Sequence, residues 1–300
     1  MTVKVRITLI VLLTMFALSA LAQTSSNSGT KPDAKRPSSS IEKPATIEAR
    51  VEKYLRDLYA WGPEYEVKVG TIKPSPIPDL LEVPVSVSMA GQGDTAVVYV
   101  SKNGTFMIRG ELADMWADPF ADVRSKLNTE NSPSMGPENA KVTLIEFADF
   151  ECPSCRQLDR ILRDYLPSHP EIRLVFKHFP LTEIHPWAMT AAIASQCTYE
   201  QNPAAFWKIH DAIFDAQDTI NPSNVKQTME DLATKQGLNL DAFKSCMSNP
   251  ATAQQVEQTK GEGKSLNITG TPTTFVNARR IMGADQPLLD HFIKFEKLPK

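Results

Sequence analysis

The hydrophobic pattern of residues 45–130 predicts a small α+β domain. Over residues 47–58, apolar side chains recur at the spacing of one helix face, which predicts an amphipathic helix. Apolar and polar residues then alternate over residues 96–101 and 105–109, as is typical of β-strands. Asn103-Gly104 lies between the two stretches, and this dipeptide favours the tight turn of a β-hairpin.

A different pattern in residues 141–300 predicts a second domain of the α/β class. Residues 142–147 are a dense apolar run, typical of a strand buried on both faces. The further elements that we expect are a helix over residues 152–165, a strand over 172–178, a long helical region over 186–264, a strand over 273–277, a short strand near 280–282 and a final helix after Asp285. The order predicts a mixed sheet covered by helices, with the helical region inserted between strands.

Two segments lie between these patterns. We expect a helix over residues 119–127 and assign it to the first domain. Residues 131–140 contain two prolines and a glycine, so we expect them to be a linker. The first domain contains neither cysteine nor histidine, which favours a structural or interaction role for it.

The beginning of the chain resembles an export signal. Lys4 and Arg6 precede an apolar run over residues 7–16, and Ala20-Leu21-Ala22 supplies the small residues of a cleavage site. An uncleaved membrane anchor is the alternative, but the apolar run is short for a span of about 20 residues. We therefore expect a signal peptide over residues 1–22 and a periplasmic or other extracytoplasmic location. Residues 23–44 are polar and rich in Ser and Pro, which predicts a disordered tether.

Composition adds two constraints. The formal net charge is −3 and basic residues are not clustered, so no nucleic-acid partner is expected. All four cysteines follow the predicted signal peptide, and an oxidising compartment permits them to form disulfides. Four cysteines allow three connectivities on paper.

The most informative motif is Cys152-Pro153-Ser154-Cys155, at the point where a buried strand ends and a helix begins. The N–H groups and dipole at a helix N-terminus favour a thiolate, so Cys152 is the expected nucleophile. Pro153 suits the first helical turn, and Cys155 is placed to resolve a mixed disulfide. A zinc site usually needs a second close pair of ligands, whereas Cys197 and Cys246 are far apart in sequence. We therefore expect a redox pair rather than a zinc site or a structural disulfide, with no metal and no cofactor.

Four markers occur in a fixed order along the second domain. They are Glu146 in the first strand, the Cys152–Cys155 motif, the stretch over residues 176–186, and Gly270-Thr271-Pro272-Thr273. Together they resemble the DsbA-like thioredoxin-fold family of thiol:disulfide oxidoreductases, over residues 142–297. The resemblance implies that Pro272 is a cis-proline facing the active site and that Thr271 offers its backbone to an extended protein substrate. It also implies a redox-recycling partner, which we expect to be membrane-bound.

Two polar residues near the motif carry further expectations. Burial would raise the pKa of Glu146 and suit it to accept the proton of Cys155, a role that the resemblance also implies; an outward-facing carboxylate is the alternative. Ser154 has no positive charge, so we expect the pKa of Cys152 to be less depressed than in relatives with histidine between the cysteines.

Cys197 and Cys246 both fall in the expected helical insertion. Export favours a structural disulfide between them, closing a loop of about fifty residues. Two buried free thiols are the alternative.

The first domain indicates whether the protein oxidises, reduces or isomerises disulfides. Its hairpin, over residues 99–110, resembles the dimerisation domain of DsbC- and DsbG-type isomerases. This resemblance implies a homodimer acting as an isomerase or reductase on protein substrates with cysteines or disulfides. The alternatives are a monomeric DsbA-like oxidase that introduces disulfides, and a module that binds a metal through its two CxxC thiols.

Overall fold

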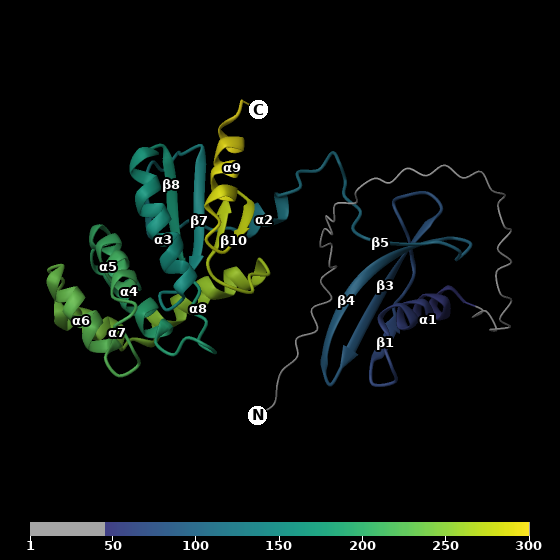
Figure 1. Ribbon diagram of the computed structural model, residues 1–300, viewed down its shortest axis with the longest axis horizontal. Coiled ribbons are helices and arrows are strands. Elements are labelled where there is room, and N and C mark those ends of the chain that lie inside the picture. The colour runs from purple at the N-terminus through teal and green to yellow at the C-terminus, as the bar shows by residue number, and fades with distance from the viewer. Residues whose placement is uncertain (1–45, 300) are drawn as a thin grey trace, which may run out of the picture. The chain divides into compact units, whose positions relative to one another are not determined.

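The computed structural model describes residues 46–299 and divides the chain into two compact units, one ending at Ala113 and the other beginning at Asp114 (Figure 1). The predicted signal peptide and tether lie outside the described residues. None of the helices in the described part is both long and apolar enough to cross a membrane.

The first unit is a helix packed on an antiparallel sheet. Helix α1 (Ile47–Tyr59) begins after Thr46, whose hydroxyl accepts a hydrogen bond from the Ala49 N–H. The strands are β1 (Glu66–Val69), β2 (Lys73–Pro74), β3 (Leu80–Met89), β4 (Gln92–Ser101) and β5 (Met107–Arg109). Their order is β1-β3-β4-β5, with β2 also paired to β3. Val51 and Leu55 of α1 pack on inward-facing valines of the sheet, which forms a core for this unit alone.

The expected helix and hairpin of this unit are both present. Strand β4 pairs with β5 across the turn that contains Asn103-Gly104. The longest pairing, however, joins β3 to β4 through a turn at Ala90 and Gly91, both of which have positive φ. The sequence pattern does not predict that turn, because an alanine does not signal a left-handed conformation.

The second unit is built on a mixed sheet in the order β10-β9-β7-β8-β6. Its strands are β6 (Ser134–Met135), β7 (Val142–Ala148), β8 (Ile172–His178), β9 (Thr273–Val276) and β10 (Arg279–Met282). Strand β7 lies parallel to β8 and antiparallel to β9. Every residue of β7 except Thr143 is buried, as the apolar run predicted.

Helices cover this sheet and form the inserted region. Helix α3 (Pro153–Tyr165), followed by the 3₁₀ turn η1 (Leu166–Ser168), and α9 (Gln286–Lys297) pack in one cluster with Leu144 of β7. The insertion between β8 and β9 comprises α4 (Ala188–Gln201), α5 (Pro203–Asp215), α6 (Val225–Lys235), α7 (Leu240–Met247) and α8 (Pro250–Ser265) (Figure 1). The predicted α/β class and the helical insertion are therefore confirmed.

The structure corrects the boundary between the two parts. Helix α2 (Ala121–Lys126), which we assigned to the first domain, belongs to the second unit, where Val123 and Leu127 pack on the cluster around Phe147. The expected linker also contains a strand, since β6 pairs antiparallel with β8. A strand of two residues among prolines has too little pattern to be recognised from sequence.

Candidate active site

The two thiols lie at the junction of β7 and α3. Cys152 is the residue at which α3 starts, with extended backbone, and Pro153 occupies the first turn. Cys152 is 8% exposed and Cys155, one turn into the helix, is fully buried. Both pack against the core of the helical insertion. The thiols of Cys152 and Cys155 are the free ones in the described part of the chain.

The two sulfurs have opposite acidities. Hydrogen bonding from the Cys155 thiol is the main influence that lowers the pKa of Cys152 to about 5, and Thr271 and the N–H groups of Cys155 and Ser154 contribute in the same direction. Burial raises the pKa of Cys155 well above its usual value. Cys152 is thus suited to attack as a thiolate, while Cys155 stays protonated.

The expectation drawn from Ser154, that the pKa of Cys152 is less depressed than in relatives with histidine between the cysteines, stays a prediction. Ser154 is exposed and supplies no positive side chain, yet the pKa of Cys152 is strongly lowered. The stabilisation comes from the neighbouring thiol and from backbone N–H groups at the helix start. The backbone N–H groups were expected to contribute, whereas the contribution of the neighbouring thiol was not expected.

The structure brings Thr271-Pro272 beside the nucleophile. The peptide bond between them is cis, and the Cys152 thiol lies 3.3 Å from the Thr271 carbonyl oxygen. The Pro272 carbonyl accepts a 2.8 Å hydrogen bond from the Gly283 N–H, which ties this loop to the end of β10. The predicted proximity is present; the substrate-binding role of Thr271 remains a prediction.

Two carboxylates, Asp149 and Glu151, flank the motif. Both are engaged elsewhere. Asp149 accepts hydrogen bonds of 2.7 Å from the Leu181 N–H and from Nδ1 of His185. Glu151 accepts one of 2.6 Å from the Trp187 N–H. These carboxylates therefore anchor the segment between β8 and α4 beside the active site.

Glu146 is buried, which excludes the outward-facing alternative. It is 1% exposed and lies on β7, two residues from Leu144 and so on the face that α3 covers. Burial, with a smaller contribution from the charge of Asp159, raises its pKa to about 8. The charge of Glu146 in turn raises the pKa of Cys155. The two groups are thus electrostatically coupled.

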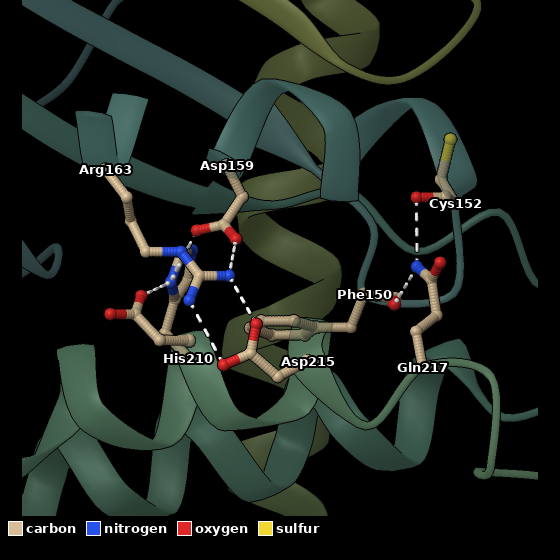
Figure 2. Close-up of polar contacts among 8 residues, drawn as sticks. Phe150, Cys152, Asp159, Arg163, His210, Asp215 and Gln217 are labelled. Carbon is tan, nitrogen blue, oxygen red and sulfur yellow. Dashed lines mark hydrogen bonds and ion pairs between the residues drawn. The ribbon is translucent and has the colours of Figure 1, made fainter. Parts of the chain in front are cut away.

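Residues of the insertion that sequence reasoning missed also contact the site. The Gln217 side-chain amide donates to the carbonyl oxygens of Phe150 at 2.8 Å and Cys152 at 3.1 Å, as Figure 2 shows. Nothing in the sequence pattern signals this contact. The pair Asp159 and Arg163, one turn apart on α3, was recognisable from its spacing.

Cys197 and Cys246 form a disulfide that joins α4 to α7 across 49 residues. The expected disulfide is present, which excludes the alternative of two buried free thiols. Within the described part of the chain, the side chains grouped closely enough to hold a metal ion are Asp159, His210 and Asp211, and neither active-site thiol belongs to that group.

Each of the two units matches a known protein family. The family model described as Thioredoxin matches residues 128–294, more than half of the chain. The model described as Disulfide bond isomerase protein N-terminal domain matches residues 38–123. The second match supports the resemblance that the hairpin suggested.

Individual relatives match a little over half of the chain. Na(+)/H(+) antiporter NhaA 3 of Salinispora tropica is 35% identical over 167 residues, covering 56% of this chain and 25% of that protein. The chain thus spans about a quarter of the length of that curated relative. Disulfide bond formation protein D of Bacillus subtilis is 26% identical over 166 residues, 53% of this chain and 73% of that protein. The solved structure of the thiol-disulfide exchange protein alpha-DsbA2 from Wolbachia pipientis is 17% identical, with a TM-score of 0.51 over 60% of this chain and all of that one, which shows a shared fold.

Proposed function

Since the chain belongs to the thioredoxin family and its second unit has the thioredoxin-like fold, we propose that it is an exported thiol:disulfide oxidoreductase acting on protein disulfides. The observation that carries the proposal is the asymmetry of the two thiols. Cys152 has a pKa lowered to about 5 at the start of α3, whereas Cys155 is buried and holds its proton.

The reaction proceeds in two exchanges. The Cys152 thiolate attacks one sulfur of a substrate disulfide, forming a mixed disulfide and releasing the other substrate sulfur as a thiolate. Cys155 then loses its proton to the Glu146 carboxylate and attacks Cys152 Sγ. This step forms the Cys152–Cys155 disulfide and releases the second substrate thiolate, so the substrate gains the two electrons that the enzyme pair loses. The reverse sequence oxidises a substrate dithiol.

The substrate is held by backbone pairing at the cis-proline loop. Thr271 lies beside Cys152 and offers its backbone to an extended polypeptide, an arrangement that places a substrate sulfur next to the nucleophile. Gln217 fixes the carbonyls of Phe150 and Cys152 and thereby positions the start of α3.

We favour isomerase or reductase activity in a homodimer, because the first unit resembles the N-terminal domain of disulfide bond isomerases. Dimerisation would hold two thiol pairs around one misfolded substrate. A periplasmic location and a membrane-bound partner that resets the thiol pair complete the proposal.

A monomeric oxidase is the second candidate, and one observation favours it. Stabilising the Cys152 thiolate stabilises the reduced form of the pair, which makes the disulfide form a stronger oxidant. A CxxC metal-binding module is less well supported, since neither thiol lies in the candidate metal group of the described residues.

Refolding of a substrate with scrambled disulfides tests the proposal. The exported chain, a Cys152→Ala variant and a variant lacking residues 23–113 are compared, with insulin reduction as a second assay. The expected result is Cys152-dependent recovery of native substrate that falls when the first unit is removed, while insulin reduction persists. Activity that does not depend on Cys152 contradicts the enzyme proposal, and recovery unaffected by the deletion favours the oxidase.

A further inference from the structure

One residue contacts both active-site cysteines through its main chain. Asp149 follows β7 directly, and its backbone N–H donates a hydrogen bond to the Cys155 sulfur, with 3.4 Å between nitrogen and sulfur. Its carbonyl oxygen accepts a 3.1 Å hydrogen bond from the Cys152 N–H. The position of this residue therefore affects the surroundings of both thiols.

The N–H donor matters most when Cys155 is ionised. Cys155 is fully buried, so its thiolate depends on protein groups for stabilisation. A hydrogen bond to an ionised acceptor is roughly twice as strong as one between neutral groups. Burial is the main influence that raises the pKa of Cys155, and the Asp149 N–H acts in the opposite direction. The donor thus stabilises the thiolate more than the thiol.

The side chain of Asp149 is held at both oxygens. Oδ1 accepts a 2.8 Å hydrogen bond from the Glu151 N–H. Oδ2 accepts hydrogen bonds of 2.7 Å from the Leu181 N–H and from Nδ1 of His185, which must be the donor because a carboxylate only accepts. The carboxylate is fully buried. It cannot turn without breaking one of these bonds, and its backbone is fixed with it.

The segment that carries His185 is itself fixed at both ends. It connects β8 to α4 over residues 179–187. The Phe179 N–H donates to the Ala148 carbonyl oxygen at 2.8 Å, which extends the pairing of β8 with β7. At the other end, the Trp187 N–H donates to the Glu151 carboxylate at 2.6 Å. The segment is therefore a firm support for the Asp149 side chain.

The insertion holds the same connection between β7 and α3 at two other carbonyls. Gln217 donates to the carbonyl oxygens of Phe150 and Cys152 (Figure 2). These bonds leave the Asp149 N–H free to point at Cys155, because they use only acceptors. The orientation of that N–H thus depends on the bonds of the Asp149 carboxylate.

We propose that the Asp149 N–H is the donor that stabilises the Cys155 thiolate in the second exchange, and that His185 is a positioning residue that holds this N–H in place through the Asp149 carboxylate. The inference deepens the proposed function, in which Cys155 attacks the mixed disulfide. An electron pair of the Cys155 thiolate forms the bond to Cys152 Sγ. The electron pair of the bond between Cys152 and the substrate leaves with the substrate sulfur as a thiolate.

Weakening the donor has two opposed effects on the rate of this step. Less Cys155 is ionised at neutral pH, but the thiolate that forms is more nucleophilic. Partial loss of a hydrogen bond to a charged group should move the ionisation of Cys155 upward by about one pH unit. With a Brønsted coefficient of about 0.4–0.5, the second exchange then becomes about threefold slower at neutral pH and about threefold faster once Cys155 is fully ionised. A general structural defect would not produce this crossing.

His185 allows a matched set of substitutions. His185→Asn places an amide N–H where Nδ1 lies and carries no charge, so it keeps the bond to Asp149. His185→Gln places its amide nearer the position of Nε2, and His185→Leu removes the donor altogether. His185 is partly exposed, so the polar Gln variant carries the test if the Leu variant does not fold. His291→Leu makes the same chemical change at an exposed position on α9 and is the control.

Stopped-flow reaction of the reduced full chain with 5,5′-dithiobis(2-nitrobenzoate) separates the two thiols. Attack by Cys152 releases one coloured thiolate in a phase whose rate rises with reagent concentration. Attack by Cys155 on the mixed disulfide releases the second in a phase whose rate does not. Both phases are measured after jumps to a series of pH values, in wild type and in each variant.

The ionisable groups near Cys155 are the same in all these proteins except at position 185, so the comparison with wild type isolates the effect of the bond. They are Cys152 at the start of α3, Asp159 on α3, Glu146 on β7, Asp149 and Glu151 beside the motif, His178 on β8 and His210 on α5.

The expected result is a crossing of the second phase in the Gln and Leu variants, slower than wild type at neutral pH and faster at high pH, with the first phase unchanged. His185→Asn and His291→Leu should follow wild type. Three results would overturn the inference: an Asn variant that behaves like the Leu variant, a second phase slowed by the same factor at every pH, or no change in any variant. The proposed function survives each of them. It fails only if wild type lacks a first phase that Cys152→Ala abolishes.

Discussion

One helical turn separates two cysteines whose acidities are shifted in opposite directions. The Cys155 thiol donates to the Cys152 sulfur, which stabilises the Cys152 thiolate and makes Cys155 harder to ionise. The pair therefore shares one proton and one negative charge at neutral pH, which is the state needed for the first exchange.

Replacing Cys155 by alanine tests this coupling. The substitution removes the largest influence that lowers the pKa of Cys152, so the midpoint should rise from about 5 toward the ordinary thiol value. The ultraviolet absorbance of the thiolate, followed against pH in both proteins, measures it. Ser154→Ala is a suitable control, since the exposed serine hydroxyl is not among the groups that shift this pKa. An unchanged midpoint in the Cys155 variant would show that the helix start alone stabilises the thiolate.

Glu146 gives a second prediction, for stability against pH. Its pKa in the folded protein is raised to about 8, above about 4.3 in an unfolded chain. The native state thus holds this proton more tightly, so the free energy of unfolding falls as pH rises from about 4 to about 8. Glu146→Gln removes the penalty and should exceed wild type in stability by up to about 5 kcal/mol at alkaline pH. Urea unfolding near pH 4 and above pH 8 measures the difference in free energy of unfolding between the variant and wild type. A difference that does not change with pH contradicts the raised pKa.

At the scale of single residues, the sequence predicted the positions of those residues that belong to a recognisable motif. Cys152, Cys155 and Thr271-Pro272 meet as expected. The sequence predicted a stabilised Cys152 thiolate at the helix start, but it did not predict the contribution of the Cys155 thiol, which depends on the direction of a thiol hydrogen bond. Gln217 was not predicted either, because its role comes only from where the chain turns after α5.

At the scale of elements, the Cys197–Cys246 bridge fastens α4 to α7 within the insertion that packs against the thiol pair. Replacing both cysteines by alanine should lower the free energy of unfolding by roughly 4 kcal/mol, since the bridge closes a loop of about fifty residues. Urea unfolding of the double variant measures the loss. The thiolate titration of Cys152 should stay unchanged, and a shifted midpoint would show that the bridge also shapes the active site.

Elements with strong periodicity were predictable, and short ones were not. The buried run of β7 and the amphipathic pattern of α1 gave the correct structures. Helix α2 was expected as a helix but in the wrong unit, because its apolar residues pack on a cluster formed by distant strands. Strand β6 exists only through its pairing with β8.

At the scale of the whole molecule, the two units have separate cores, so each supplies its own stability. We expect the full chain to be a dimer and a variant lacking residues 23–113 to be a monomer. Light scattering at micromolar concentration measures both masses. A monomeric full chain would remove the dimeric-isomerase proposal and leave the oxidase.

The disulfide between Cys197 and Cys246 also means that the protein itself depends on disulfide formation to reach its native state. A newly made chain carries four reduced cysteines, and only one of the three ways of joining them in two pairs links Cys152 to Cys155. Maturation therefore needs an oxidant to form the bridge and an exchange activity to correct mispaired chains. If existing copies supply that exchange, each mature molecule speeds the maturation of the next, and the first copies made after a period without the protein should mature most slowly.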